Sequence, residues 1–330
     1  AVFSLGPKAL IMFFTGTVGI IIGGPIALII VSAINPEITA GVGPDALWRG
    51  LSTIAGSWIG GGANQAAMLE IYEYNPEKYG GMVLVDIVVA NLWLALLLMG
   101  VGKTEKIDKW LKADTSAIER LKHKVSDYAE SIVRNPTLAD YMVMFGITFG
   151  AVGLAHWGAN GISDYLTSNF DAFTNSKSAL SSLSSSFFWM ITIATAIGIA
   201  LSFTRAKEYE GAGASKLGSV FLYILVATIG MKMDLTKVFE NPGLIGIGLI
   251  WISIHALLLI GVAKLIKAPY FFLAVGSQAN VGGAASAPVV AAAFHPSLAT
   301  VGVLLAVLGY AVGTYGAILS AVLMQIAAVS

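Results

Sequence analysis

The chain has 330 residues, of which 56% are hydrophobic and 12% charged, and its formal net charge is zero. This composition excludes an ordinary soluble domain, in which about 25% of residues are charged, and gives no reason to expect a nucleic-acid partner. Cysteine is absent, which excludes disulfides, thiol catalysis and cysteine-ligated metal. The histidines are scattered without the spacing of metal ligands, so we expect no zinc site.

Apolar runs recur along the chain, and several are long enough to cross a lipid bilayer, which takes roughly 20 residues. We expect membrane spans at about 9–33, 82–101, 138–157, 181–203, 214–231, 243–263 and 298–322. Two further apolar stretches, 46–72 and 268–294, are interrupted by glycine. The sequence therefore predicts an all-α integral membrane protein whose surroundings are the lipid bilayer.

The segment between the second and third spans is rich in Lys and Arg, which places it on the cytoplasmic side. Within it, Ser116 and Glu119 form a capping box that predicts an amphipathic helix over about 117–133. We interpret this helix as part of a cytoplasmic linker over 102–137. The polar segment 158–185 is poor in Lys and Arg and is expected to be an outer loop.

Two short motifs resemble each other: GSWIGGGANQA at Gly56–Ala66 and GSQANVGGAASA at Gly276–Ala287. Paired glycine-rich breaks in matching halves of a membrane protein indicate a transporter's binding site, because interrupted helices expose N–H and C=O groups that hold solutes and ions. Polar side chains accompany both breaks. The candidate binding residues at the motifs are Gly61, Gly62, Asn64, Gln65, Ser277, Gln278, Asn280, Gly282, Gly283 and Ser286.

The repeat extends beyond the motifs, because each motif lies between two predicted spans. It divides the chain into the C-terminal part of a first repeat (1–101), the linker (102–137), three scaffold spans of a second repeat (138–237) and the core part of that repeat (238–330). Both core parts contain two spans and one glycine-broken stretch. Because the first repeat shows no counterpart of the scaffold spans, we expect that three N-terminal helices are missing.

The orientation of the repeats depends on what the glycine-broken stretches do. If each is a re-entrant hairpin, the number of crossings between the two core parts is odd and the repeats are inverted. If each is a broken helix that crosses the membrane, the repeats point the same way. We prefer the hairpins, because they place the Lys- and Arg-rich segments on one side.

Asp86 is the acidic residue that lies well inside a predicted span, where a charge is costly and is usually functional. It could carry a proton, or bind Na⁺ together with Asn64 and Asn280, or instead lie near the headgroups as a capping residue. Asn91 follows it on the same span, and Thr314 lies on the matching span of the second repeat; both are further candidates. His255 lies in mid-span, and a hydrogen-bonded packing histidine is preferred there to a proton relay.

The stretches Leu51–Met68 and Gly276–Pro288 resemble those of the bacterial and plastid membrane proteins of domain-of-unknown-function family 819. That family is similar to the cation/proton antiporter and anion transporter superfamily, which includes sodium–glutamate, bile-acid and citrate symporters. The resemblance implies a scaffold, a mobile core and elevator-type alternating access, often coupled to Na⁺. By position, it places Asn64, Gln65, Gln278, Asn280 and Ser286 where such relatives bind substrate and sodium.

The function predicted from the sequence is secondary active transport of a small polar solute, anionic or zwitterionic, coupled to Na⁺ or H⁺. No catalytic residue and no cofactor are expected, the protein is predicted to reside in the bacterial inner (plasma) membrane, and a homodimer through the scaffold spans is predicted. One alternative is a cation/proton antiporter that uses Asp86. Another is a membrane-embedded enzyme or sensor, for which the sequence shows no catalytic pair near the motifs.

Overall fold

The computed structural model describes residues 6–39, 41, 43–116, 118, 134–174, 184–214, 216–218, 220, 221, 224, 227, 231 and 243–329. This described part is helical and contains no strand. It separates into two units, one made of residues 1–69, 73–127 and 229–330 and the other of 70–72 and 128–228. Nearly all of the predicted amphipathic helix at 117–133 and half of the predicted span 214–231 lie outside the described residues.

The second unit contains α8 (Leu138–Asn169), α9 (Asp171–Thr174), α10 (Ser186–Ser202) and a 3-10 turn, η4 (Arg205–Glu210). A capping box of Thr137 and Asp140 begins α8, and Arg134 donates two hydrogen bonds of 2.9 and 2.7 Å to the Asp140 carboxylate. The predicted outer loop was wrong in its first part, because α8 continues to Asn169. Polar residues there lie on a helix that begins as a membrane span.

The first unit contains α1 (Pro7–Ile34), α3 (Leu47–Gly60), α5 (Tyr79–Val101), α12 (Gly243–Leu265) and α15 (Ala299–Val329) as its principal helices. Shorter elements are α2 (Pro36–Thr39), η2 (Gly43–Asp45), α4 (Gly62–Ile71, up to Leu69), α6 (Thr104–Leu111), α13 (Tyr270–Val281), α14 (Gly283–Phe294) and η6 (Pro296–Leu298). Among the described residues α1, α5, α8, α12 and α15 are long and apolar enough to cross a membrane, and α10 is shorter.

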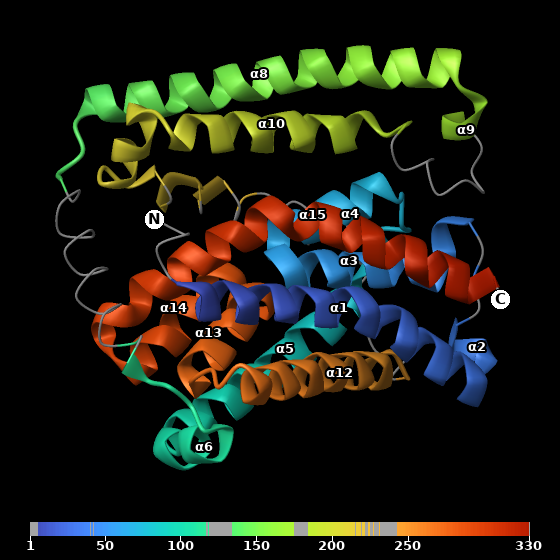
Figure 1. Ribbon diagram of the computed structural model, residues 1–330. Helices are drawn as coiled ribbons and strands as arrows, with labels where there is room; N and C mark the ends of the chain where they lie inside the picture. The colour runs from blue at the N-terminus through green and yellow to red at the C-terminus, as the bar shows by residue number, and fades with distance from the viewer. Residues whose placement is uncertain are drawn as a thin grey trace. The chain divides into compact units, whose positions relative to one another are not determined.

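Helices α1 and α12 lie side by side and run in opposite directions (Figure 1). Glycines of α1 make the contact possible: a Cβ built on Gly19 would lie 3.0 Å from the His255 Cα, and one on Gly24 would lie 2.7 Å from the Trp251 ring. The Trp251 Nε1 donates a 2.8 Å hydrogen bond to the Ile20 carbonyl. Residues later in α1 therefore meet residues earlier in α12.

Both glycine-broken stretches fold back on themselves. A Cβ on Gly56 of α3 would lie 2.6 Å from the Asn64 carbonyl oxygen of α4, and the Gln278 side chain of α13 bonds to Ser286 of α14. The two helical pairs approach α15 from opposite ends (Figure 1). Gly302, early in α15, packs on the Ala287 backbone, whereas Gly316, later in α15, packs on Ile59.

The broken helices lie inside the first unit. Every residue of α13 is buried, and so is the run Gly50–Gly60 of α3. An interrupted helix at membrane depth is tolerated where protein or a polar cavity covers its free backbone groups. The burial of these segments satisfies that condition.

Helix α6 packs against the N-terminal end of α13. The Asp108 carboxylate accepts a 2.7 Å hydrogen bond from the Tyr270 backbone N–H, and the Tyr270 hydroxyl donates to the Leu97 carbonyl at 2.8 Å. Burial raises the pKa of Asp108, and the bond from Tyr270 acts in the opposite direction. The carboxylate therefore caps a helix whose N-cap residue, Pro269, makes no side-chain cap.

Candidate functional site

The two helix breaks touch. Gly61 ends α3 with φ 80° and ψ −174°, and Gly283 begins α14 with φ 55°. A Cβ built on Gly283 would lie 3.7 Å from the Gly61 Cα, and Cβ atoms on these glycines would lie 3.3 and 3.9 Å from the Tyr310 ring. We call this contact, with its neighbours Gly62 and Gly282, the tip junction. The two motifs, which are far apart in the sequence, thus meet at one site.

Small residues of α15 bring both hairpins to the tip junction. A Cβ on Gly309 would lie 2.8 Å from the Ile59 carbonyl oxygen and 3.2 Å from that of Ala279. One on Gly313 would lie 2.8 Å from the Gly60 Cα. Any side chain at these positions would separate α15 from the hairpins, so the spacing Gly309/Gly313 serves helix packing.

Two helix N-termini meet at the tip junction, those of α4 and α14. The first N–H groups of a helix have no partner inside it, and they carry a partial positive charge. The Gly61 carbonyl accepts hydrogen bonds from the N–H groups of Asn64 and Gln65, and no side chain caps α14. Ala63 and Ala285 are exposed, so both helix starts are accessible. The arrangement suits an anionic group.

Asn64 and Asn280 each connect two elements of the first unit through side-chain hydrogen bonds, and we call each connection a brace. The Asn64 Nδ2 donates to the Gly60 carbonyl at 2.8 Å, and its Oδ1 accepts from the Thr314 hydroxyl at 2.6 Å. The Asn280 Oδ1 accepts from the Thr17 hydroxyl at 2.8 Å, and its Nδ2 donates to the carbonyls of Phe13 and Gly276. One brace ties the first hairpin to α15, and the other ties the second hairpin to α1.

Asp86 is partly buried on α5 and anchors α3. Its Oδ2 accepts a 2.7 Å hydrogen bond from the Ser57 hydroxyl, and its Oδ1 accepts a 2.8 Å bond from the Trp58 Nε1. The side-chain amide of Gln65 also interacts with this carboxyl. Asp86 is therefore joined to the residues that lead into and out of the first break.

Asp86, Asn64 and Asn280, which were predicted as possible Na⁺ ligands, do not share one hydrogen-bond network in this structure. The side-chain oxygens of the three residues each accept hydrogen bonds from protein donors, and they do so in separate local networks. Among the residues that the structure describes, no group of three or more His, Asp or Glu side chains is placed to hold a metal ion. Na⁺ prefers a cage of oxygen ligands, as hard cations do.

A second buried network holds α13. The Trp93 Nε1 donates to the Ser277 hydroxyl at 2.8 Å, which lies 2.8 Å from the His255 Nε2, while the His255 Nδ1 lies 2.9 Å from the Gly16 carbonyl. A carbonyl oxygen only accepts, so the Nδ1 carries the proton and the Ser277 hydroxyl donates to Nε2. His255 is thus a buried, hydrogen-bonded histidine, as preferred from the sequence.

Asn91 and Thr314, both candidates from the sequence, differ in their relation to the tip junction. Asn91 is exposed on α5 and donates to the Ile87 carbonyl of its own helix at 2.8 Å, so the structure does not bring it to the tip junction. Five residues rotate about 140° around a helix, which turns Asn91 away from the face of Asp86. Trp93, seven residues after Asp86, returns to that face and was not predicted as a site residue. Thr314 does reach the site, through Asn64.

Sequence reasoning also missed Ser57, Trp58, Thr17 and Tyr310 as functional neighbours. Ser57 and Trp58 lie within the first glycine motif, and their place one turn before the break was a usable signal. Thr17 is a polar residue within an apolar run, which was a weaker one. Nothing in the sequence connects Tyr310 with both breaks, because that contact exists through tertiary packing alone.

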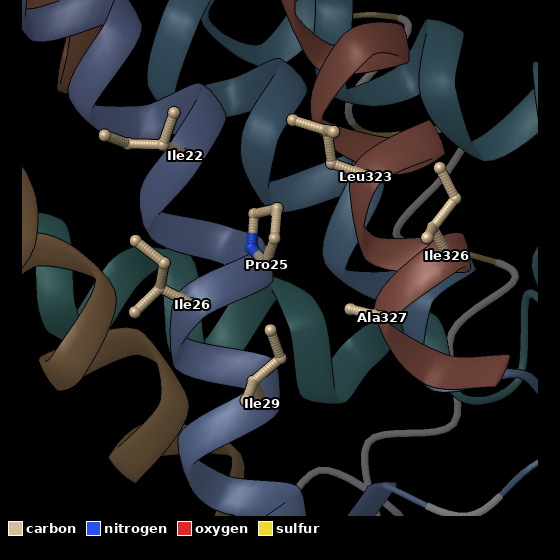
Figure 2. A pocket seen from close by; sticks show the side chains of 7 residues that line it. All are labelled: Ile22, Pro25, Ile26, Ile29, Leu323, Ile326 and Ala327. Carbon is tan, nitrogen blue, oxygen red and sulfur yellow. The ribbon is translucent and has the colours of Figure 1, made fainter. Parts of the chain in front are cut away.

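An apolar hollow of about 360 Å³ lies between α1 and α15 (Figure 2). It is lined by Ile22, Pro25, Ile26, Ile29, Leu323, Ile326 and Ala327. A lining of hydrocarbon side chains offers no hydrogen bond to a polar solute. It therefore does not compete with the tip junction as a site for a polar ligand.

The apolar helices and the buried helix breaks define a helical integral membrane protein. The chain belongs to the family described as "Protein of unknown function (DUF819)", which it matches over residues 1–326. It is also similar to the uncharacterized membrane protein YjcL of Bacillus subtilis (strain 168), with 26% identity over 323 residues, which cover 95% of this chain and 75% of that protein. No solved structure matches.

Proposed function

We propose that this protein is a secondary active transporter that binds a small polar solute, anionic or zwitterionic, at the tip junction. The observation that carries the proposal is the contact between Gly61 and Gly283, where two interrupted helices meet inside the unit. Broken helices of this kind hold transported solutes in other membrane carriers, because their free backbone groups replace lost hydration. An enzyme would need a catalytic pair of side chains near the two motifs, and the sequence shows none there.

The coupling ion is Na⁺ or H⁺, and Asp86 is the group that links it to the cargo. Its carboxyl contacts Ser57 and Trp58 before the first break and Gln65 after it. A change in the charge of Asp86 therefore affects the start of α4 through the side chain of Gln65. The same contacts favour a second candidate function, a cation/proton antiporter in which Asp86 exchanges the ions and no organic solute binds.

The helices of the first unit form the mobile core in this proposal, and α8 and α10 belong to the scaffold. The directions of the helices support an inverted pair of repeats, α1 with its hairpin and α5 against α12 with its hairpin and α15 (Figure 1). Elevator movement of the core, a homodimer through the scaffold and residence in the bacterial inner membrane complete the proposal.

Uptake by purified protein in proteoliposomes tests the function. A panel of labelled small carboxylates and amino acids is offered under an inward gradient of H⁺ or of Na⁺. We expect accumulation of at least one solute under one of the gradients, and its loss when an ionophore collapses that gradient. Failure of every solute under both gradients, combined with ion exchange by the same vesicles, would favour the antiporter instead.

Single cysteines test the inverted arrangement, and the natural chain provides a cysteine-free background. Glu37, on α2, is an exposed position at one end of the first unit. Lys106, on α6 just after α5, and His295, just after α14, are exposed positions at the other end. We expect a membrane-impermeant thiol reagent to label Lys106→Cys and His295→Cys from one side and Glu37→Cys from the other. Labelling of all three from a single side would contradict the inverted repeats.

A further inference from the structure

Two amide atoms beside the tip junction are buried without a hydrogen bond of ordinary geometry among the described residues. They are the Gln65 Nε2, a donor, and the Gln278 Oε1, an acceptor. Their residues are 8% and 1% exposed. Buried polar groups in proteins are nearly always hydrogen-bonded. The Gln278 Oε1 therefore indicates a partner that comes from outside the chain. The Gln65 Nε2 has the Asp86 carboxyl beside it, and of its two N–H groups one is left for such a partner.

Both amides belong to the tip junction by position. The Gln278 amide lies over Gly282, the residue that precedes α14, where a Cβ would collide with it. Its Nε2 donates to the Ser286 hydroxyl at 2.7 Å, which leaves the Oε1 as the unpaired end. Gln65 lies in the first turn of α4 and its backbone N–H bonds to the Gly61 carbonyl at 3.1 Å. The Gln65 Nε2 donor and the Gln278 Oε1 acceptor thus lie on the two hairpins whose helix starts meet at the tip junction.

The charges around the junction limit the cargo further. Residues 50–77 and 268–330 contain no Lys or Arg. The charged side chain joined to the first break is a carboxylate, Asp86. The positive potential at the junction therefore comes from helix N-termini and amide N–H groups, which together stabilise about one negative charge. A second carboxylate on the cargo would meet no Lys or Arg from these two segments.

We propose, building on the function proposed above, that the cargo is a small monocarboxylate with a hydrogen-bond donor of its own next to the carboxylate. The carboxylate accepts from the Gln65 Nε2 and from the helix starts of α4 and α14. The neighbouring hydroxyl or ammonium group donates to the Gln278 Oε1. Gln278 is then the residue that distinguishes a substituted carboxylate from a plain one.

Equilibrium binding to the purified full chain tests the assignment. The probes are L-alanine, L-lactate and propionate, which share a three-carbon carboxylate and differ in the donor, and succinate, which adds a second carboxylate. We expect the wild type to bind L-alanine or L-lactate about fivefold to tenfold more tightly than propionate, as one hydrogen bond provides, and to bind succinate most weakly. The alanine and lactate arms show whether the donor is an ammonium or a hydroxyl group.

Variants assign the two contacts. Gln278→Met should remove the preference over propionate and leave propionate binding unchanged, whereas Gln65→Met should weaken all three monocarboxylates together. Gln278→Glu retains an acceptor oxygen at the same length and should keep a preference for the donor-bearing probe. It provides the comparison if the methionine variant fails to fold.

Equal binding of propionate and the donor-bearing probes by the wild type would overturn the assignment, and so would the absence of binding by all of them. Equal weakening of every probe by Gln278→Met would also overturn it. Coupled uptake of a dicarboxylate in proteoliposomes would remove this cargo class while leaving the transporter function in place. Absence of coupled uptake of any solute would instead contradict the proposed function itself.

Discussion

Replacing Asp86 with asparagine should reduce coupled uptake to the level of protein-free liposomes while the protein stays folded. An asparagine can keep both local bonds, because its oxygen accepts from the Trp58 Nε1 and its amide donates to the Ser57 hydroxyl. It carries no negative charge, so it neither attracts a cation nor takes up and releases a proton. The expected loss therefore reports coupling rather than stability.

The measurement compares gradient-driven uptake with thermal unfolding of the same purified variant. Asp164→Asn is the matched control, because Asp164 is an exposed carboxylate on α8, in the second unit. It should retain wild-type uptake. If Asp86→Asn transports normally, the carboxyl has no part in coupling. If solute exchange without a gradient survives in Asp86→Asn, the cargo site and the coupling group are separate.

Replacing Gly61 with alanine should damage both folding and function. The backbone at Gly61, with φ 80° and ψ −174°, lies in a region that is accessible essentially to glycine alone. Holding alanine there costs about 1–3 kcal/mol, and its Cβ would come within 3.3 Å of the Tyr310 ring. We expect the first hairpin to shift away from Gly283, with loss of ligand binding and a lower unfolding temperature.

Gly102→Ala is the matched control for this substitution. Gly102 follows α5 with an ordinary φ of −66°, and a Cβ there would meet nothing within 4 Å. Thermal unfolding and solute binding of the two variants should therefore differ clearly. Equal behaviour of Gly61→Ala and Gly102→Ala would show that the contact between the tips is not required.

Much of the architecture followed from local sequence patterns. The apolar runs at 9–33, 82–101, 243–263 and 298–322 correspond to α1, α5, α12 and α15, because a stretch of this length and hydropathy forms a helix in a bilayer. The breaks at Gly61 and at Gly282–Gly283 occur where glycines cluster. Burial of His255 also followed, since an apolar span surrounds it.

The partners of the polar side chains did not follow in the same way. Asn64 and Asn280 were expected as ion ligands, and in the structure their side-chain oxygens accept hydrogen bonds from Thr314 and Thr17, residues more than 200 positions away. Sequence spacing gives the face of a helix on which a side chain lies, but it does not give the helix that this face meets. The helical period turns Asn91 away from the face of Asp86, whereas the contact of Tyr310 with both breaks depends on tertiary packing.

By itself, the sequence determined an all-helical membrane protein with two glycine-broken helices, because hydropathy and backbone freedom are properties of single residues and their neighbours. Only the tertiary structure decided that the two breaks touch, that both pack on α15 at Gly309 and Gly313, and that the Gln278 Oε1 is buried there without a partner. Those facts depend on the approach of helices that are distant in the chain, and close packing of small residues fixes that approach.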